Sequence, residues 1–330
     1  MPFSPAIRPF NVPTGPWVGF VAVLALFSLL IGIKGGLGTF WSTGNLAVLL
    51  HEATIPAVVG LGMLLVLVSG GIDLSVGAVV ALVTVVAMRV YTAAHAEWGA
   101  GAQTSLAAVA AGVAVGGACG IANGLLVTRL NLPPFVATLG MFGIARGVAV
   151  WLAGRTTLAF PDGATPDWSL ALAKTSFLNP GLLSLAVLAG LTAVLLRLTV
   201  LGRHVYAVGS NEATARLCGV NVPRTKLLVY SLAGLLTGWA GVLMFAHSNS
   251  GNPTLGEQLE LDVITAVVIG GASLGGGKGT VVGALLGVAI LGLIKNGVSL
   301  FNVPVEMQYI LIGVLLLANV ALTRWRGGGR

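Results

Sequence analysis

Residues 270–280, GGASLGGGKGT, have the glycine and lysine content of a phosphate-binding loop. Such a P-loop has the spacing Gly, four residues, Gly-Lys and then directly Ser or Thr, whose hydroxyl binds Mg²⁺. Counting back from Gly277 and Lys278, the first glycine position is Ala272, and the residue after the lysine is Gly279. The spacing therefore predicts that this turn does not bind ATP.

Other polar residues fall inside apolar runs without forming a chemical site. His51 and Glu52 are adjacent, but no further ligand lies near them at the spacing of a zinc site. We interpret them as a mutual polar contact that faces the interior of a helix bundle. Cys119 and Cys218 have no metal-site spacing either, so the sequence predicts no catalytic and no metal-binding residues.

Four polar residues in the apolar runs are candidates for a polar path through the protein. They are Asn45, Asn123, Thr138 and Arg146. Ionisable side chains at membrane depth are costly and often functional, so Arg146 can neutralise an acid or line such a path. The sequence leaves open which of the four face a path and which contact neighbouring helices.

The composition indicates an integral membrane protein. Of the 330 residues, 56% are hydrophobic and 8% are charged, and the mean hydropathy is +0.97. Soluble domains carry about 25% charged residues. A net charge of +7 would suggest a nucleic-acid partner for a soluble protein, but basic residues of membrane proteins collect on the cytoplasmic side. We therefore expect contact with membrane lipid and none with nucleic acid.

Ten apolar runs predict an all-α, polytopic bundle of about ten transmembrane helices, because about 20 mostly apolar residues span a bilayer as a helix. Glu260 and Asp262 near the start of the eighth run make it the weakest of the ten. The runs are residues 17–33, 45–68, 74–91, 104–127, 135–153, 181–198, 227–248, 258–273, 280–296 and 306–323.

The basic residues predict which side of the membrane each connection occupies. Ten spans place both termini on one side. Cytoplasmic termini put 11 of the 17 Lys and Arg residues in the cytoplasm, whereas the opposite orientation puts the most basic loop and the tail outside. We therefore predict a cytoplasmic segment 1–16, a transmembrane domain 17–323 with a main cytoplasmic loop 199–226, and a cytoplasmic tail 324–330.

Glycines recur at every fourth position in two places. The two sets are Gly112, Gly116, Gly120 and Gly124, and then Gly279, Gly283 and Gly287. Small residues at this spacing form a ridge that lets helix backbones approach closely in a membrane. Each ridge predicts either a static packing surface or a surface along which helices slide.

Two glycine-rich turns interrupt the apolar runs. In residues 69–77, SGGIDLSVG, Gly70 and Gly71 break the helix, and Asp73 can cap the next helix. A proton-relay or substrate-binding role is the alternative for Asp73. Residues 270–279 form a comparable break. Irregular backbone is tolerated at membrane depth only where protein or water covers it, so both turns should lie inside the protein or at its cytoplasmic face, with Lys278 facing cytoplasm or a lipid headgroup.

The loop 202–226 predicts one short helix. Ser210 or Asn211 can cap it, Glu212 and Arg216 occupy its first and last turns, and Gly219 can end it. The two charged residues are four apart, in the favourable order for an ion pair. About two turns of helix are too short to be stable alone, so the helix must dock on this protein's own surface or on a cytoplasmic partner.

Several segments together resemble the membrane-spanning permease subunits of bacterial monosaccharide ABC importers of the ribose, xylose, arabinose and galactose type. They are SGGIDLSVGAVVAL, PPFVATLGMFGIARG, GRHVYAVGSNEATARLCGVNV and ELDVITAVVIGGASLGGGKGTVVGALLGV, and the similarity extends over roughly residues 45–323. The resemblance implies a bacterial cytoplasmic-membrane protein that works with a second permease subunit in a homodimer or heterodimer, with cytoplasmic ATP-binding subunits and with a periplasmic sugar-binding protein. ATP and Mg²⁺ would then bind the ATPase subunits, and this chain would carry no cofactor and be no enzyme.

The resemblance also implies roles for two groups of residues. The segment NEATARLCG is similar to the coupling helix that fits a groove on the ATPase subunit. The coupling residues would be Asn211, Glu212, Ala213, Thr214, Ala215, Arg216, Leu217 and Gly219, and the family's signature turns would contain Gly70, Gly71, Asp73, Ser75, Gly270, Gly271, Gly277 and Lys278.

Other solutes and one other class of transporter stay open at this point. A related ABC permease can carry nucleosides, furanosyl signalling compounds or branched-chain amino acids. An ion-coupled secondary transporter would need acids at membrane depth, for which Glu52 is the best-placed candidate. The sequence does not identify the sugar.

Overall fold

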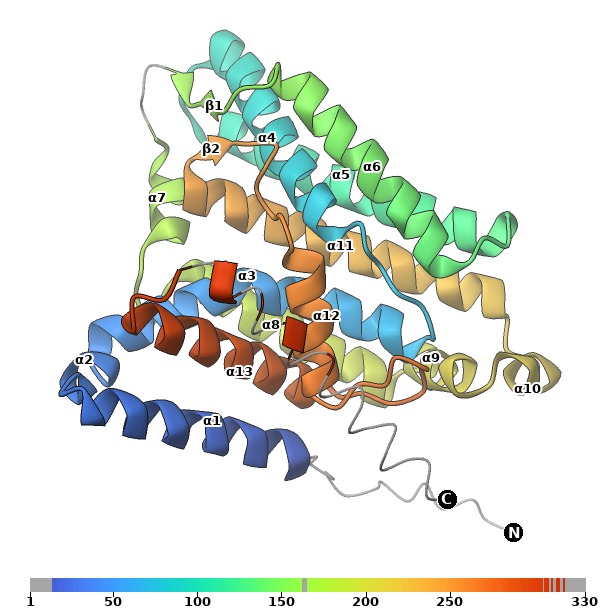
Figure 1. The fold of residues 1–330 in the computed structure, drawn as a ribbon. Helices are drawn as coiled ribbons and strands as arrows, with labels where there is room; N and C mark the ends of the chain where they lie inside the picture. The colour runs from blue at the N-terminus through green and yellow to red at the C-terminus, as the bar shows by residue number, and fades with distance from the viewer. Residues whose placement is uncertain are drawn as a thin grey trace.

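The computed structural model describes residues 14–161, 165–304, 306–308, 310, 313, 314 and 317 as a bundle of helices (Figure 1). Among these residues, eight helices are long and apolar enough to cross a membrane. They are α1 (Thr14–Ile33), α3 (Thr43–Val68), α4 (Val76–Trp98), α5 (Ala102–Arg129), α6 (Pro134–Ala153), α8 (Pro180–Leu198), α11 (Val222–Ser248) and α13 (Val281–Leu300). The predicted all-α, polytopic membrane fold is confirmed.

The remaining elements are short. They are α2 (Leu37–Phe40), α7 (Asp167–Ala173), α9 (Val200–Ser210), α10 (Glu212–Leu217), α12 (Leu259–Ile269), β1 (Leu158–Ala159) and β2 (Ser250–Gly251). The two strands pair antiparallel, with Leu158 opposite Gly251. Hydroxyl side chains cap several of the helices: Ser42, Thr199 and Thr280 each accept a bond from the backbone N–H three residues on.

The helix α12 differs from the prediction of a span over residues 258–273. It has 11 residues and ends at Ile269, and Gly271 follows with a φ of 94°. At about 1.5 Å per residue, α12 is roughly 16 Å long, about half the thickness of the hydrocarbon core. The prediction of a full span here is therefore wrong. Residues 1–13 of the predicted N-terminal segment, most of the predicted span 306–323 and the tail 324–330 lie outside the described residues.

The starts of α4 and α12 meet inside the bundle. A Cβ atom added to Gly77 would lie 2.3 Å from the carbonyl oxygen of Gly256 and 2.2 Å from a carboxylate oxygen of Glu260, so only glycine fits there. The segments before both helices are irregular, and Asp73 and Ser75 in the first of them are buried. The irregular backbone before α4 is thus enclosed by protein, as the absence of water in a bilayer requires, whereas Thr254 and Glu257 before α12 are exposed.

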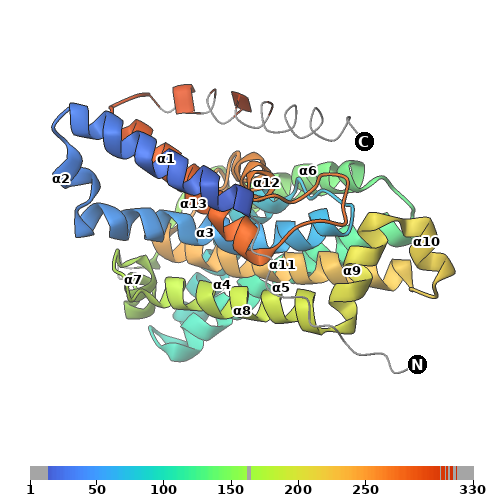
Figure 2. The same ribbon diagram turned by 90° about the horizontal axis from the view of Figure 1, so that it is seen from below.

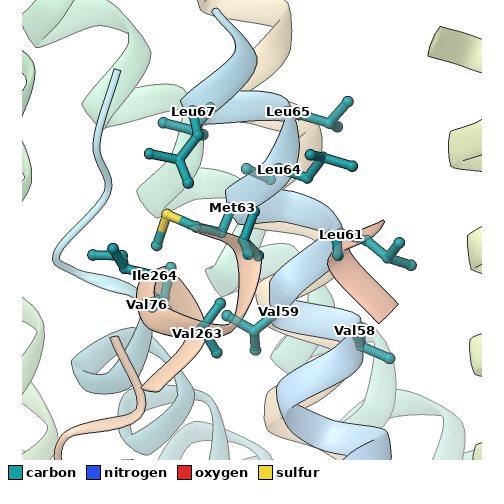
Figure 3. Packing of buried hydrophobic residues seen from close by; sticks show 14 of the residues in the cluster. Val58, Val59, Leu61, Met63, Leu64, Leu65, Leu67, Val76, Val263 and Ile264 are labelled. Atoms are coloured by element: carbon teal, nitrogen blue, oxygen red, sulfur yellow. The ribbon is translucent and has the colours of Figure 1, made fainter. Parts of the chain in front are cut away.

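The centre of the molecule is built around α3. Its residues Val58, Leu61 and Leu64 are fully buried, in contact with apolar side chains from several other helices. Figure 3 shows part of this core, in which Val263 and Ile264 of α12 lie beside the side chains of α3. Because this part of α3 is enclosed by protein, it cannot face lipid.

The first glycine ridge packs against α11. A Cβ atom on Gly116 would lie 2.3 Å from the Cα atom of Gly238, and one on Gly120 would lie 2.3 Å from the carbonyl oxygen of Tyr230. The backbones of α5 and α11 therefore touch, which the small-residue spacing predicts. The second set is not one helical ridge, because Gly279 precedes α13; Gly283 and Gly287 pack against α12.

The outward faces of α1, α6 and α8 are apolar. Leu29, Ile144 and Leu191 are each at least 60% exposed. Exposed apolar surface of this extent is expected where helices contact lipid. Together with the spans, it makes the chain a multi-pass membrane protein.

Candidate functional site

One end of the bundle carries α9 and α10, and α10 extends beyond the long helices (Figures 1 and 2). Sequence reasoning predicted the second of these helices and missed the first. Thr199 caps α9 and is the signal that could have found it, followed by apolar residues at Val200, Val205 and Val208. Together, α9 and α10 form the connection between α8 and α11.

The helix α10 has the predicted cap, ion pair and end. The Asn211 side chain accepts a bond from the Thr214 N–H at 2.9 Å. Glu212 contacts Arg216 at 3.2 Å and Lys226 of α11 at 2.6 Å. Gly219, with a φ of 82°, follows the helix. The second ion pair, to Lys226, fixes the start of α10 to α11.

Ala215, one of the eight predicted coupling residues, faces this chain itself. It is buried together with Val208 of α9 and Val222 of α11. The exposed residues of α10 are Ala213, Thr214, Arg216 and Leu217, of which Leu217 is 89% exposed. A six-residue helix is therefore held on its own protein and presents one large apolar side chain to solvent.

The two glycine-rich turns converge on α9. The Gly277 N–H donates to the Val68 carbonyl at 2.9 Å, which joins the second turn to the end of α3. The Tyr206 hydroxyl of α9 donates to the Gly279 carbonyl at 2.7 Å. A Cβ atom on Gly209 would lie 1.7 Å from the Val68 carbonyl oxygen, so α9 rests directly on this junction. The helix α9 therefore contacts both turns.

The other residues of the two predicted turns belong to the same end. Gly70 lies beside Gly209, and Lys278 is exposed. Gly270 packs against the backbone of Gly283, and Gly271 lies near Pro16 of α1. The turn 270–279 thus connects α12 and α13 at the end of the bundle that carries α10.

Asp73 holds the first turn, residues 69–77, in place through hydrogen bonds. Its carboxylate accepts bonds from the Ser75 N–H at 2.9 Å and from the Ser75 hydroxyl at 2.6 Å. The Asn123 amide donates to the same hydroxyl at 3.0 Å, and the Thr138 hydroxyl lies 3.2 Å from the Ile72 carbonyl. Asn123 and Thr138 are buried, and both hold this turn against α5 and α6.

Asn45 and Arg146 lie elsewhere and hold other segments. Asn45 forms a reciprocal amide pair with Asn296 of α13, at 2.8 and 3.1 Å. Arg146 donates to the carbonyls of Pro253 and Leu255 in the segment before α12. The four candidates for a polar path therefore do not come together.

A cavity of about 620 Å³ opens in the half of the bundle away from α10, between α3, α11, α12 and α13. Its lining contains two histidines, three acids, one lysine and one asparagine: His51, His247, Glu52, Glu257, Asp262, Lys295 and Asn296. Such a concentration of polar groups is uncommon in a chain with 8% charged residues. Sequence reasoning missed this cavity, because its polar residues come from four separate helices and from the irregular segment before α12.

Polar contacts tie the walls of this cavity together. His51 pairs with His247 of α11, with 2.6 Å between Nε2 and Nδ1. The predicted polar contact between His51 and Glu52 is replaced by contacts with a third residue: His51 pairs with His247, and Glu52 lies 3.6 Å from His247 Nε2. Lys295 of α13 forms an ion pair with Asp262 of α12. Within the described part of the chain, no three His, Cys, Asp or Glu side chains gather closely enough to hold a metal ion.

Comparisons with known proteins agree with the resemblance seen in the sequence. Residues 45–320 match the family model described as the permease component of branched-chain amino acid transport systems. The chain is 36% identical to the ribose import permease protein of Escherichia coli K12, over 93% of this chain and 94% of that one. It is 34% identical to the fructose import permease protein of Rhizobium meliloti, over 94% of this chain and 84% of that one.

A third relative is named for another sugar. The chain is 34% identical to the L-arabinose ABC transporter permease protein of Azospirillum brasilense, over 98% of this chain and 94% of that one. No solved structure matches the chain significantly.

Proposed function

The chain belongs to the family of permease components described for branched-chain amino acid transport systems, and we propose that it is the membrane-spanning subunit of an ATP-driven importer for a monosaccharide. The family description names amino acids, whereas the three relatives are named for ribose, fructose and arabinose. Because each relative covers more than nine-tenths of this chain, the sugar is the better-supported solute.

The observation that carries the proposal is the position of α10. It presents Leu217 at one end of the bundle and is fixed to α11 through Glu212 and Lys226. A cytoplasmic ATPase subunit that binds this surface can therefore push on a helix that is already formed. The coupling segment is then residues 211–219, with Ala215 directed inward and Leu217 directed to the partner.

The contacts of α9 supply a route from α10 to the membrane helices. Closure of two ATPase subunits on ATP would move α10 and α9 together. Because α9 rests on the Val68–Gly277 junction, the movement reaches the end of α3 and the start of α13. Both helices also line the cavity in the other half of the bundle. In this mechanism ATP and Mg²⁺ act on the ATPase subunits, and this chain moves the solute.

The proposed assembly has a second permease subunit and a periplasmic sugar-binding protein that delivers solute to the end opposite α10. The α10 end then faces the cytoplasm, with both termini on that side. This orientation agrees with the charge distribution: Arg129, Arg203, Arg216, Arg224 and Lys278 all belong to the α10 end. The opposite end carries the acids Glu52, Glu97 and Asp167 and fewer basic residues, among them Lys34, Arg89, Arg155 and Lys174.

Uptake into proteoliposomes tests the function. The vesicles contain this chain with its cognate ATPase subunit and binding protein, and the labelled solutes are D-ribose, D-fructose, L-arabinose and L-leucine. We expect uptake of one of the sugars, dependent on ATP and absent with a non-hydrolysable ATP analogue. Uptake of leucine alone would favour an amino-acid permease. Uptake driven by a proton gradient without ATP would show an ion-coupled transporter.

A further inference from the structure

The cavity between α3, α11, α12 and α13 combines an apolar wall with charged groups on its rim. Ile55, Met244, Ala266, Val288 and Leu291 supply the apolar wall. Its volume of about 620 Å³ lies in the range of small-molecule sites, which are mostly apolar with a few polar groups that select the ligand. The charged groups on the rim that have no ion-pair partner therefore indicate which solutes can enter.

The charges on the rim do not cancel. Asp262 and Lys295 neutralise each other in an ion pair. Glu52 and Glu257 also line the cavity, and both are exposed, Glu52 to 65% of its side chain. Apart from His51 and His247, of which His247 lies 3.6 Å from Glu52, the lining has three carboxylates and one ammonium group.

Charged residues near the cavity but outside its lining do not change this excess of carboxylates. Arg146 lies close enough to Glu257 and Glu260 to interact with both, but its guanidinium binds the carbonyls of Pro253 and Leu255. Arg146 and Glu260 add one charge of each sign. Lys34, another cation of that end, lies over the Phe301 ring, 4.4 Å from the ring centre, and is not part of the lining. A chain with a net charge of +7 thus contains a cavity with an excess of negative charge.

We propose that this cavity receives the transported solute and that Glu52 and Glu257 select uncharged, hydroxyl-rich molecules by repelling anions such as sugar acids and sugar phosphates. The proposal rests on the proposed function and adds a selective step within the permease itself. The apolar wall contacts the C–H faces of a sugar ring, and the carboxylates accept bonds from its hydroxyl groups. An anionic sugar of the same size meets two further carboxylates, while the one ammonium group of the lining is already paired with Asp262.

The local potential can be measured with a reporter thiol. Ser299 is exposed and lines the cavity, so Ser299→Cys is placed in a chain that also carries Cys119→Ala and Cys218→Ser. The purified permease alone is treated at pH 8 with two methanethiosulfonates of similar size, one cationic and one anionic. Their rates are divided by those for a small free thiol. We expect the cationic reagent to react faster. The ratio of its normalised rate to that of the anionic reagent should fall on the order of tenfold at low salt in Glu52→Gln/Glu257→Gln.

Two matched comparisons complete the experiment. Glu97→Gln removes an exposed acid outside the cavity and should leave the ratio unchanged. Millimolar D-galactose should slow modification of the reporter, whereas equal D-galacturonate, which differs by one carboxylate, should not. In Glu52→Gln/Glu257→Gln the galacturonate should protect as well. Size-exclusion chromatography first shows that each variant is folded.

Three results would overturn the inference: equal normalised rates for both reagents, equal protection by both sugars in the unsubstituted cavity, or protection by neither. None of these measurements needs ATP or the partner subunits. Failure here with intact sugar uptake would refute only the selective cavity, whereas a negative cavity in a chain that transports no sugar would refute the proposed function.

Discussion

Asp73 shows how one acid inside a membrane protein can have a structural role. Its carboxylate accepts two bonds from Ser75, and Ser75 in turn accepts from Asn123. The network fixes the turn from which α4 begins. We therefore interpret Asp73 as the organiser of this turn, and the proton-relay alternative predicts a different response to substitution.

Two substitutions at Asp73 separate these roles. Asp73→Asn keeps an acceptor oxygen, so stability should change by about 1 kcal/mol and sugar uptake should persist. Asp73→Leu leaves the Ser75 N–H and hydroxyl without their acceptor, at a cost of about 1–3 kcal/mol for each buried group. Thermal melting of the purified variants and uptake in proteoliposomes measure both effects. Loss of uptake in a fully stable Asp73→Asn protein would instead assign a proton to this side chain.

Local patterns predicted polar residues well where their partners are near in sequence. The Asn211 cap and the Glu212–Arg216 pair follow from residues within a few positions of one another. The Asp262–Lys295 and His51–His247 pairs could not be predicted, because they join segments far apart in the chain. Their formation depends on how α12 and α11 pack against α13 and α3.

The helices α5 and α11 make the closest backbone contact that the glycine spacing predicts. Gly116→Leu should prevent this contact, since even a Cβ atom would lie 2.3 Å from the Gly238 Cα atom. We expect destabilisation by about 1–3 kcal/mol or more and a low yield of folded protein. Thermal melting and size-exclusion chromatography measure the effect.

A matched substitution on α8 is the control for that prediction. Gly190 is exposed, and a Cβ atom added there would have no other atom within 4 Å, so Gly190→Leu should be tolerated. Equal yields and melting temperatures for the two variants would show that α5 and α11 are not in contact at Gly116.

At the scale of elements, hydropathy identified the eight long helices and misjudged α12. Residues 258–273 are apolar enough for a span, but the segment before α12 enters the bundle and shortens the helix to 11 residues. The close approach of Gly77 and Gly256 that makes this possible involves residues about 180 positions apart. No local pattern reports such a contact, which is why the irregular segments were harder to predict than the helices.

The orientation of the whole molecule follows from the position of its basic residues. A cysteine at Ser210, which is exposed beside α10, should stay unlabelled when intact cells are treated with a membrane-impermeant maleimide. A cysteine at Thr165, at the opposite end, should react. Both variants carry Cys119→Ala and Cys218→Ser, and both should react after the cells are opened. The reverse pattern in intact cells would place α10 outside and contradict the topology.

In the whole molecule, a chain of contacts joins α10 to the cavity in the other half of the bundle. The connection runs through α9 to the junction of Val68 and Gly277, and then along α3 and α13. Coupling therefore requires that α10 bind its partner firmly. Leu217, at 89% exposure, is the apolar side chain best placed for that contact, and the helix does not need it for its own packing.

The most direct test is Leu217→Ser in the complete transporter, with ATP hydrolysis and sugar uptake measured on the same proteoliposomes. Loss of an apolar anchor at an interface typically costs about 1–2 kcal/mol or more, so both activities should fall together by about tenfold or more while the permease melts at its unmodified temperature. Leu178→Ser, which alters a leucine of 80% exposure at the opposite end, should leave both activities intact. Unchanged uptake and unchanged sugar-stimulated ATP hydrolysis in Leu217→Ser would contradict the assignment of α10 as the coupling helix.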